Sequence, residues 1–175
     1  MKSILRSSIV LLLFLFTSLC TANAAQNKPE TIPPFLFNTL NFMYKISGKE
    51  NLRTNIIDFA SQYVGTPYRS GGIKPSGFDC SGFVKYVFSQ YGYDLAHSSR
   101  SLSTKGETIK KVDAQPGDLV FFAVNGRVHH VAMVHSNVEG DLKIIHSCNS
   151  KGVYIESVND SRYWSSRLYS IKRIL

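Results

Sequence analysis

Apolar residues in the first half of the chain gather in three stretches that predict helices. The stretch 35–46 is apolar and aromatic and predicts a short helix that packs on the domain, ended by Ser47–Glu50. Between 51 and 64 the apolar positions form one stripe and predict a second helix. In the third stretch, 83–91, they again share one face, which predicts a helix that directly follows a loop rich in Gly, Pro and Ser.

The second half of the chain has the patterns of strands. Apolar stretches of five to eight residues alternate with turn signals such as Asn125-Gly126. The predicted strands span 118–124, 128–135, 142–148, 153–158 and 168–174. A polar, loop-like segment, 94–116, precedes them, and a short irregular or helical crossing, 159–166, precedes the last. Helices followed by an antiparallel meander indicate an α+β fold.

The first 24 residues have the three-part pattern of a secretory signal peptide. A basic start precedes the apolar run Ile9–Leu19, and Ala22–Ala24 supplies small residues for cleavage before Ala25. The run is short for a transmembrane helix. Cys20 raises the alternative of a lipid anchor, which is less favoured because Leu19 stands where lipoprotein cleavage needs a small residue. We therefore expect an exported protein of the periplasm, the cell wall or the extracellular space.

Three parts are expected: a signal peptide at 1–24, an N-terminal extension at 25–51 and one domain at 52–175. The formal charge is +8, and removing 1–24 takes away two basic residues and no acids, leaving +6 (8 − 2). A basic exported protein suits an anionic surface such as a cell wall or a membrane. The chain lacks a zinc-ligand pattern, a basic helix and an aromatic RNA-binding signature, so nucleic acid is not an expected partner.

The third helix is preceded by the sequence Phe78-Asp79-Cys80-Ser81-Gly82. Cys80 is therefore expected at a helix N-terminus, where free backbone N–H groups and the helix dipole favour an anion. Such a position lowers the pKa of a thiol and favours the nucleophilic thiolate. An isolated cysteine is also typical of a hydrophobic core, so the rest of a site must decide between the two interpretations.

A thiol nucleophile needs a base within hydrogen-bond reach, and the base needs a group that orients it. The candidate histidines are His97, His129, His130, His135 and His146. His129 and His130 are neighbours on a predicted strand, so only one of them can face the Cys80 helix. His146 ends the next strand, where it could bind the far ring nitrogen of His130. These patterns do not rank His129 against His130, and a metal site is less favoured because no third ligand follows at a recognisable spacing.

Five sequence blocks extend this pattern over most of the domain. They are Gly65–Tyr68 with Gly71-Gly72, Gly77–Val84, Pro116–Phe122, His130-Val131 and Ile145–Ser147. In order and spacing they closely resemble the NlpC-type peptidoglycan cysteine peptidases, and the likeness extends from about Arg53 to the end of the chain. The resemblance implies a papain-like α+β fold, with N-terminal helices packed on a central antiparallel sheet and the nucleophile at a helix N-terminus.

The resemblance also implies roles for three residues: Cys80 as nucleophile, His130 as base and later acid, and His146 as the orienting residue. It implies no metal and no organic cofactor. The expected activity is that of a cysteine endopeptidase on the peptide stems or cross-links of peptidoglycan, at bonds of D-glutamate, diaminopimelate or D-alanine. The alternatives are an amidase that cuts the muramoyl–L-alanine bond and a non-catalytic wall-binding module. A monomer is expected.

Four further residues are implied as substrate-binding. Tyr68 matches a tyrosine that lines the family's site and assists at the oxyanion. Asp79 and Ser81 flank the nucleophile, where some members hold a substrate amine, although Asp79 suits a helix cap equally well. Ser99 matches a segment that borders the cleft, with Ala96 in place of a usual proline.

Cys148 adds a second hypothesis about the nucleophile. It shares a strand face with His146, two residues before it, and so is expected near Cys80. A Cys80–Cys148 disulfide would silence the nucleophile reversibly and place the enzyme under redox control. The alternative is a free, partly buried thiol.

Overall fold

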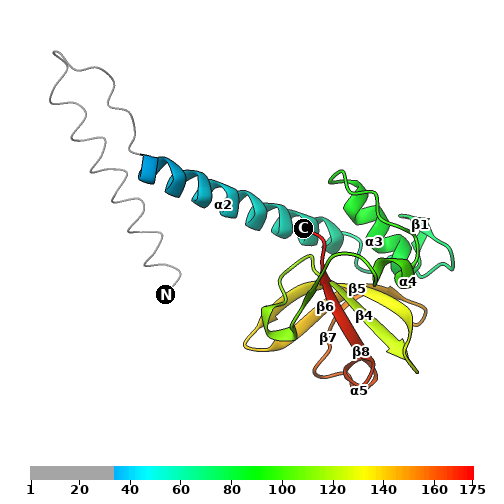
Figure 1. The fold of residues 1–175 in the computed structure, drawn as a ribbon. Coiled ribbons are helices and arrows are strands. Elements are labelled where there is room, and N and C mark those ends of the chain that lie inside the picture. Colours follow the sequence, from blue (N-terminus) through cyan, green and yellow to red (C-terminus); the bar gives the residue numbers. More distant parts are fainter. Residues whose placement is uncertain (1–33) are drawn as a thin grey trace, which may run out of the picture. The chain divides into compact units, whose positions relative to one another are not determined.

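The computed structural model describes residues 34–175. Its elements are α2 (Pro34–Ser61), β1 (Ile73–Lys74), β2 (Gly77–Phe78), α3 (Cys80–Ser89), α4 (Ser99–Leu102), β3 (Glu107–Ile109), the 3-10 turn η1 (Lys111–Asp113), β4 (Leu119–Val124), β5 (Arg127–Val138), β6 (Asp141–Cys148), β7 (Gly152–Ser157), α5 (Arg162–Ser165) and β8 (Leu168–Arg173) (Figure 1). The predicted signal peptide, 1–24, and the first part of the predicted extension lie outside the described residues. Within 34–175, no helix combines the length and the apolar character needed to cross a membrane.

Six antiparallel strands form the main sheet, in the order β3-β8-β4-β5-β6-β7. Strands β4 to β7 follow one another as the predicted meander, and β8 returns to pair with β4 on one side and β3 on the other. Asn125 and Gly126 turn the β4–β5 hairpin with positive φ angles of 50° and 73°, as a tight turn between twisted strands requires. Strands β1 and β2 form a separate two-stranded ladder just before α3.

Both faces of the main sheet are buried, and successive strand residues divide between them. One face packs against α3 and the end of α2, and its strand residues include Leu119, Phe121, Val131, Met133 and Ile145. The other face carries Val120, Phe122, Ala132, Val134, Ile144 and, from α5, Trp164. In Figure 1, α3 lies above the sheet and α5 below it. Helices thus pack on a central antiparallel sheet, and the predicted α+β fold is confirmed.

The predicted helix break at Ser47–Glu50 is wrong, because one continuous helix, α2, runs from Pro34 to Ser61. Gly48 lies inside it, and a Cβ at this position would have nothing within 4 Å. A glycine in an exposed helix costs only about 1 kcal/mol relative to alanine, which is too little to end a helix whose neighbouring residues tolerate it.

The segment 94–116, predicted as a loop, contains the short elements α4, β3 and η1. Strand β3 is the edge of the main sheet and pairs Glu107 with Arg173 and Ile109 with Ile171. Two of its three side chains are exposed, since an edge strand needs no alternation of apolar residues. This explains why the hydrophobic pattern did not predict it.

The Pro116–Phe122 block contains a fully buried carboxylate, Asp118. Arg53 of α2 donates to it at 3.0 Å, and Arg173 of β8 donates at 2.8 Å. Arg53 also donates to the backbone carbonyl of Leu175 at 3.2 Å. A buried charge is stable only with such partners. Asp118 therefore fastens the second half of α2 and the C-terminal strand to the start of β4.

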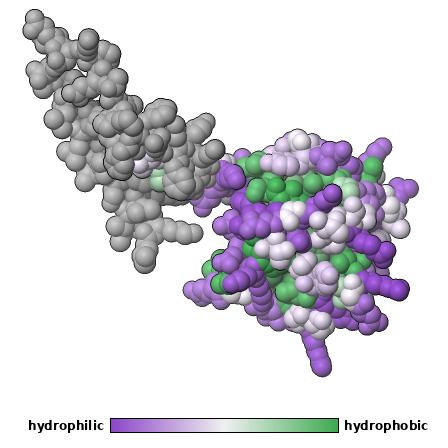
Figure 2. Space-filling model, viewed as in Figure 1, coloured by the Kyte–Doolittle hydropathy of each residue, from purple (hydrophilic) through white to green (hydrophobic). Residues whose placement is uncertain are grey.

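The outer surface is mixed in character. The face seen in Figure 2 is mostly hydrophilic, with smaller hydrophobic areas between the polar side chains. Such a mixture is ordinary for a globular domain, because polar residues are too few to cover its whole surface.

Candidate active site

Cys80 is the first residue of α3, as predicted, and Asp79 caps that helix. The Asp79 carboxylate accepts a hydrogen bond from the Gly82 N–H at 2.7 Å through Oδ1 and one from the Gly71 N–H at 3.1 Å through Oδ2. The loop packs so tightly here that a Cβ at Gly82 would lie 2.0 Å from the carbonyl oxygen of Gly72. A glycine at position 82 is therefore needed for the close approach of loop and helix.

The Cys80 thiol is partly buried, and the expectation of a lowered pKa is wrong. Burial raises the pKa of this thiol above its ordinary value of 9.0, because the charged thiolate loses solvation. Backbone N–H groups of Val131, Ser81 and Cys80 itself act in the opposite direction without reversing the shift. Cys80 is therefore a neutral thiol at neutral pH. The same N–H groups are placed to stabilise negative charge on its sulfur when it forms.

His130 lies on β5 and His146 on β6, and their rings meet. His130 Nε2 lies 2.7 Å from His146 Nδ1. His130 is only 7% exposed and His146 is fully buried. Burial, followed by the charges of His146 and His129, holds the pKa of His130 well below its usual 6.5, so this imidazole is neutral near neutral pH. The arrangement leaves His130 Nδ1 as the ring nitrogen that is free to act as a base.

The register of β4 and β5 separates the two neighbouring histidines. Phe122 pairs with His130, whereas the next pair is Ala123 with Val128, so the strand bulges at His129. His129 is exposed, while His130 shares its buried face with Ala132, as alternation predicted. The geometry thus favours His130 over His129 as the partner of the thiol.

The remaining candidate histidines have other surroundings. His97 lies 2.8 Å from Oδ2 of Asp79 through its Nε2 atom, a contact that the sequence reasoning did not foresee. His135 lies near the far end of β5, where its Nδ1 atom is buried and has no hydrogen-bond partner within the described chain.

A carboxylate that the sequence reasoning missed lies beyond His146. Glu156 of β7 places Oε1 at 2.8 Å from His146 Nε2, and the hydroxyl of Tyr154 donates a short hydrogen bond to the same oxygen. Tyr154 pairs with His146 across the β6–β7 ladder, so Glu156 lies diagonally opposite. An acid inside a predicted strand, two residues after a tyrosine and therefore on the same face, was the available signal.

Trp164 of α5 packs against both histidine rings, with centroid distances of 4.7 Å to His130 and 5.0 Å to His146. Its ring also packs against Phe122, with the centroids 4.6 Å apart. The indole is 7% exposed, so it shields the histidine pair from water on that face.

A cavity of about 530 Å³ collects these groups. Its lining includes Tyr68, Cys80, His129, His130, Cys148, Asn149, Ser150, Tyr154, Glu156, Ser161, Tyr163 and Trp164. Cys80, at the start of α3, and His130, whose ring contacts that of His146, thus line one space. Across residues 34–175, no group of three or more His, Cys, Asp or Glu side chains has an arrangement that could hold a metal ion.

The four predicted substrate-binding residues differ in position. Tyr68 lines the cavity, and burial, together with the nearby Cys80, raises the pKa of its hydroxyl. Asp79, Ser81 and Ser99 are not among the residues of the described chain that line it. Ser81 is buried and donates to Asp79 at 3.2 Å. Ser99 is the first residue of α4.

Cys148 also lines the cavity, so both cysteines of the predicted domain face the same space, as expected. Both are free thiols in this structure. The Cys148 sulfur lies 3.1 Å from the hydroxyl oxygen of Ser150. The redox hypothesis stays a prediction.

Comparison with known proteins decides the family. The model of the NlpC/P60 family matches residues 65–173, which is more than half of the chain. The chain belongs to the NlpC/P60 family. The expected family, its papain-like fold and its class, a cysteine-type peptidase, are thereby confirmed.

Individual relatives agree with this assignment. The chain is 29% identical over its full length to 95% of the Escherichia coli K12 protein named murein DD-endopeptidase MepS/murein LD-carboxypeptidase. It is 37% identical, over 65% of its length and 69% of the relative's, to a probable endopeptidase of Haemophilus influenzae. It is 35% identical to the gamma-DL-glutamyl hydrolase of Bacillus subtilis, over 68% of this chain and 29% of that protein.

Solved structures show the same fold. An NlpC/P60 family protein from Bacillus cereus superposes with a TM-score of 0.65 at 31% identity, over 70% of this chain and 40% of that one. The NlpC/p60 domain of the peptidoglycan hydrolase SagA superposes with a TM-score of 0.56 at 34% identity, over 67% of this chain and 96% of that domain.

Proposed function

We propose that this protein is an exported cysteine endopeptidase that hydrolyses the peptide stems or cross-links of peptidoglycan, at bonds of D-glutamate, diaminopimelate or D-alanine. The observation that carries the proposal is the 2.7 Å contact between His130 and His146 in a cavity that Cys80 also lines. Family membership supports it, as does the similarity to a murein endopeptidase over almost the whole of that relative.

The first chemical step is proton transfer from Cys80 to His130. Both groups are neutral at rest, so His130 Nδ1 takes the thiol proton as the sulfur attacks the peptide carbonyl carbon. The new C–S bond forms while the carbonyl π electrons move to oxygen. His146 holds the ring of His130 and shares the positive charge that the proton brings.

Backbone N–H groups at the start of α3 are suited to stabilise the oxyanion, because the first turn of a helix has unpaired donors. The Tyr68 hydroxyl, in the same cavity, is a second candidate donor. Collapse of the intermediate breaks the C–N bond, and His130 returns its proton to the departing amine. Water activated by His130 then hydrolyses the thioester and frees Cys80.

Asp79 could hold a substrate amine only at the expense of its present partners. Its two oxygens already accept hydrogen bonds from the N–H groups of Gly82 and Gly71 and from the Ser81 hydroxyl. Oδ2 also lies 2.8 Å from His97 Nε2. We therefore propose Asp79 first as the cap of the nucleophile helix. Ser99 remains a proposed contact for a part of the substrate that extends beyond the cavity, whereas the buried Ser81 is proposed to support the Asp79 carboxylate.

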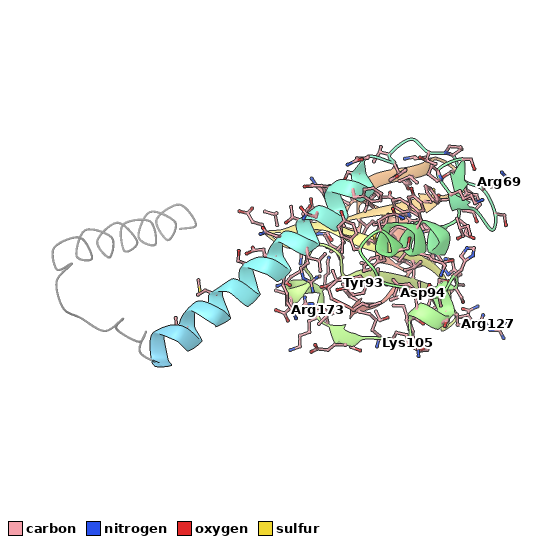
Figure 3. The ribbon with its side chains drawn as sticks, turned by 90° about the horizontal axis from the view of Figure 1, so that it is seen from above. Arg69, Tyr93, Asp94, Lys105, Arg127 and Arg173 are labelled. Carbon is pink, nitrogen blue, oxygen red and sulfur yellow. The ribbon has the colours of Figure 1, made fainter. Side chains whose placement is uncertain are left out.

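Location and partners complete the proposal. The signal-peptide pattern at 1–24 supports export to the periplasm or the wall, and the domain is proposed to work as a monomer. Arg69, Lys105 and Arg127 are exposed and point away from the domain (Figure 3). These cations would favour approach to an anionic wall.

The test uses purified protein and its Cys80→Ala variant, each incubated with peptidoglycan and with defined muropeptides under reducing conditions. Mass spectrometry should find cleaved stem peptides with the wild type alone, and the masses of the new ends name the bond. Release at the muramoyl–L-alanine bond would instead make the protein an amidase. If neither protein cleaves and both sediment with walls, the binding-module alternative replaces the enzyme.

A further inference from the structure

A chain of hydrogen bonds runs away from the cavity through three strands. It passes from His130 on β5 to His146 on β6 and then to Glu156 on β7, with heavy-atom distances of 2.7 and 2.8 Å. The hydroxyl of Tyr154 contacts the same Glu156 oxygen and holds it in place. His146 is fully buried in the middle of the chain, and the Glu156 side chain is 20% exposed.

Glu156, the last member of this chain of hydrogen bonds, determines which ring nitrogens of His146 and His130 carry a proton. A carboxylate only accepts hydrogen bonds, so the 2.8 Å contact requires a proton on His146 Nε2. A neutral His146 then has a bare Nδ1, which can only accept. His130 must therefore carry its proton on Nε2, and its Nδ1 is left bare. This is the tautomer that a base for Cys80 needs.

Glu156 is ionised at neutral pH. Burial raises the pKa of Glu156, while hydrogen bonds from His146 and Tyr154 lower it by more, so that its pKa lies below the usual value. The negative charge therefore faces the histidine pair throughout the pH range in which a thiol peptidase works.

We propose that Glu156 is a positioning residue for the reaction, which sets the tautomers of His146 and His130 and thereby leaves His130 Nδ1 free to take the proton of Cys80. Glu156 acts through His146 and does not touch the reacting atoms. Its charge also stabilises the positive charge that the histidine pair gains during attack. The inference rests on the proposed function, since it deepens the role of the same site.

The charged and titratable groups around the pair come from every neighbouring element. They are Cys80 of α3, Tyr68 of the preceding loop, His129 of β5, Cys148 of β6, Tyr154 and Glu156 of β7, and Tyr163 of α5. Of these, only Glu156 is a carboxylic acid. A change in the pH profile on removing it can thus be assigned to this carboxylate.

The test compares Glu156→Leu, Glu156→Gln and a control, Glu50→Gln, which makes the same charge change at an exposed position of α2. Glu156→Leu removes the acceptor, so kcat on a muropeptide should fall about 10- to 100-fold, with KM within about twofold. Glu156→Gln keeps an acceptor oxygen and loses the charge. It should lower kcat about tenfold or less and move the acid limb of the profile to lower pH, since the protonated pair loses a favourable charge. Glu50→Gln should match the wild type.

NMR of ¹⁵N-labelled histidines reads the tautomers without any substrate. The wild type should show Nε2–H and bare Nδ1 on both His130 and His146; Glu156→Gln should keep this pattern, and Glu156→Leu should lose it. A proton on His130 Nδ1 in the wild type would overturn the proposal. So would unchanged tautomers and kcat in Glu156→Leu, or a raised KM with unchanged kcat, which would mark Glu156 as a substrate-binding residue.

The test still gives an answer if a variant fails to fold or if the wild type cleaves no muropeptide. If Glu156→Leu fails to fold, the nearly isosteric Glu156→Gln decides through its acid limb and its kcat. If the wild type cleaves no muropeptide but shows the expected tautomers, and Glu156→Leu loses them, the proposed function fails while the positioning role of Glu156 stands.

Discussion

The proposed nucleophile, Cys80, and its proposed base, His130, are held by two different kinds of structure. Cys80 is fixed within a short piece of chain, by the cap from Asp79 and by the tight contact between Gly82 and Gly72. His130 is fixed by side-chain contacts across three successive strands, to His146 on β6 and through it to Glu156 on β7. Contacts within the loop and the first turn of α3 position Cys80, whereas the register of the sheet positions His130.

Substitutions around α3 and substitutions in the sheet are expected to act in different ways. A change on the helix side acts mainly through the backbone, because caps and close glycine contacts set where α3 begins. A change on the sheet side acts mainly through protons, because the histidine pair depends on which ring nitrogen carries hydrogen. The two sides meet where the Ser147 hydroxyl of β6 donates to the Phe78 carbonyl at 2.8 Å, just before Cys80.

The largest effect is expected from His130 and its neighbour on the sheet side. His130→Gln should lower kcat/KM by about 10⁴-fold, because the base and its link to His146 are both lost. His129→Gln should lower kcat/KM by far less, at most about tenfold, since His129 lines the cavity but is exposed, lies in the bulge and has no contact with His146 like that of His130. Kinetics on a defined muropeptide measure both, and equal losses would contradict the assignment of the base.

The next largest effect is a loss of stability from a substitution at the start of α3. Gly82→Ala would put a Cβ 2.0 Å from a backbone carbonyl, so the loop or the helix must move, and stability should fall by about 1–3 kcal/mol. Gly48→Ala is the matched control, because its Cβ would meet nothing within 4 Å and alanine is the better helix former. It should stabilise by up to about 1 kcal/mol. Urea unfolding of both variants checks the opposite signs.

A smaller effect separates the two interpretations of Asp79. Asp79→Ala removes the helix cap and should cost about 1 kcal/mol of stability. Asp79→Asn keeps an acceptor for the Gly82 N–H and should cost much less. Unfolding midpoints and KM are measured on both. A KM that rises in Asp79→Asn while its stability is kept would make the residue a binder of substrate amine in addition to a cap.

The smallest change is expected across neutral pH in the unmodified protein. Burial puts the pKa of His130 below 6.5 and that of Cys80 above 9.0, so both stay neutral between these values. The form with a neutral thiol and a neutral imidazole is lost below the first pKa as His130 protonates, and above the second as the thiol ionises. We therefore expect kcat/KM to be nearly level from about pH 7 to 8.5. A steep rise through pH 8 would contradict this and indicate that the thiol must ionise before attack.

The sequence predicted the helix that begins at Cys80 well, since a cap, a glycine and an apolar face all lie within a few residues of one another. The strands from β4 to β8 were also predicted within a few residues, because buried strands separated by clear turns leave a strong pattern. Strand β3 and the continuity of α2 were not predicted. An edge strand need not alternate, and one glycine is a weak helix breaker.

By itself the sequence determined the candidate nucleophile, the set of candidate histidines and, through five ordered blocks, the family. The tertiary structure decided three further points. The bulge at His129 turned one histidine outward and left the other buried. Burial raised the pKa of Cys80, although its position at a helix N-terminus had suggested the opposite. The β6–β7 register brought Glu156 to His146. All three depend on desolvation and on contacts between strands, which are set by the register of the sheet and leave no local pattern in the chain.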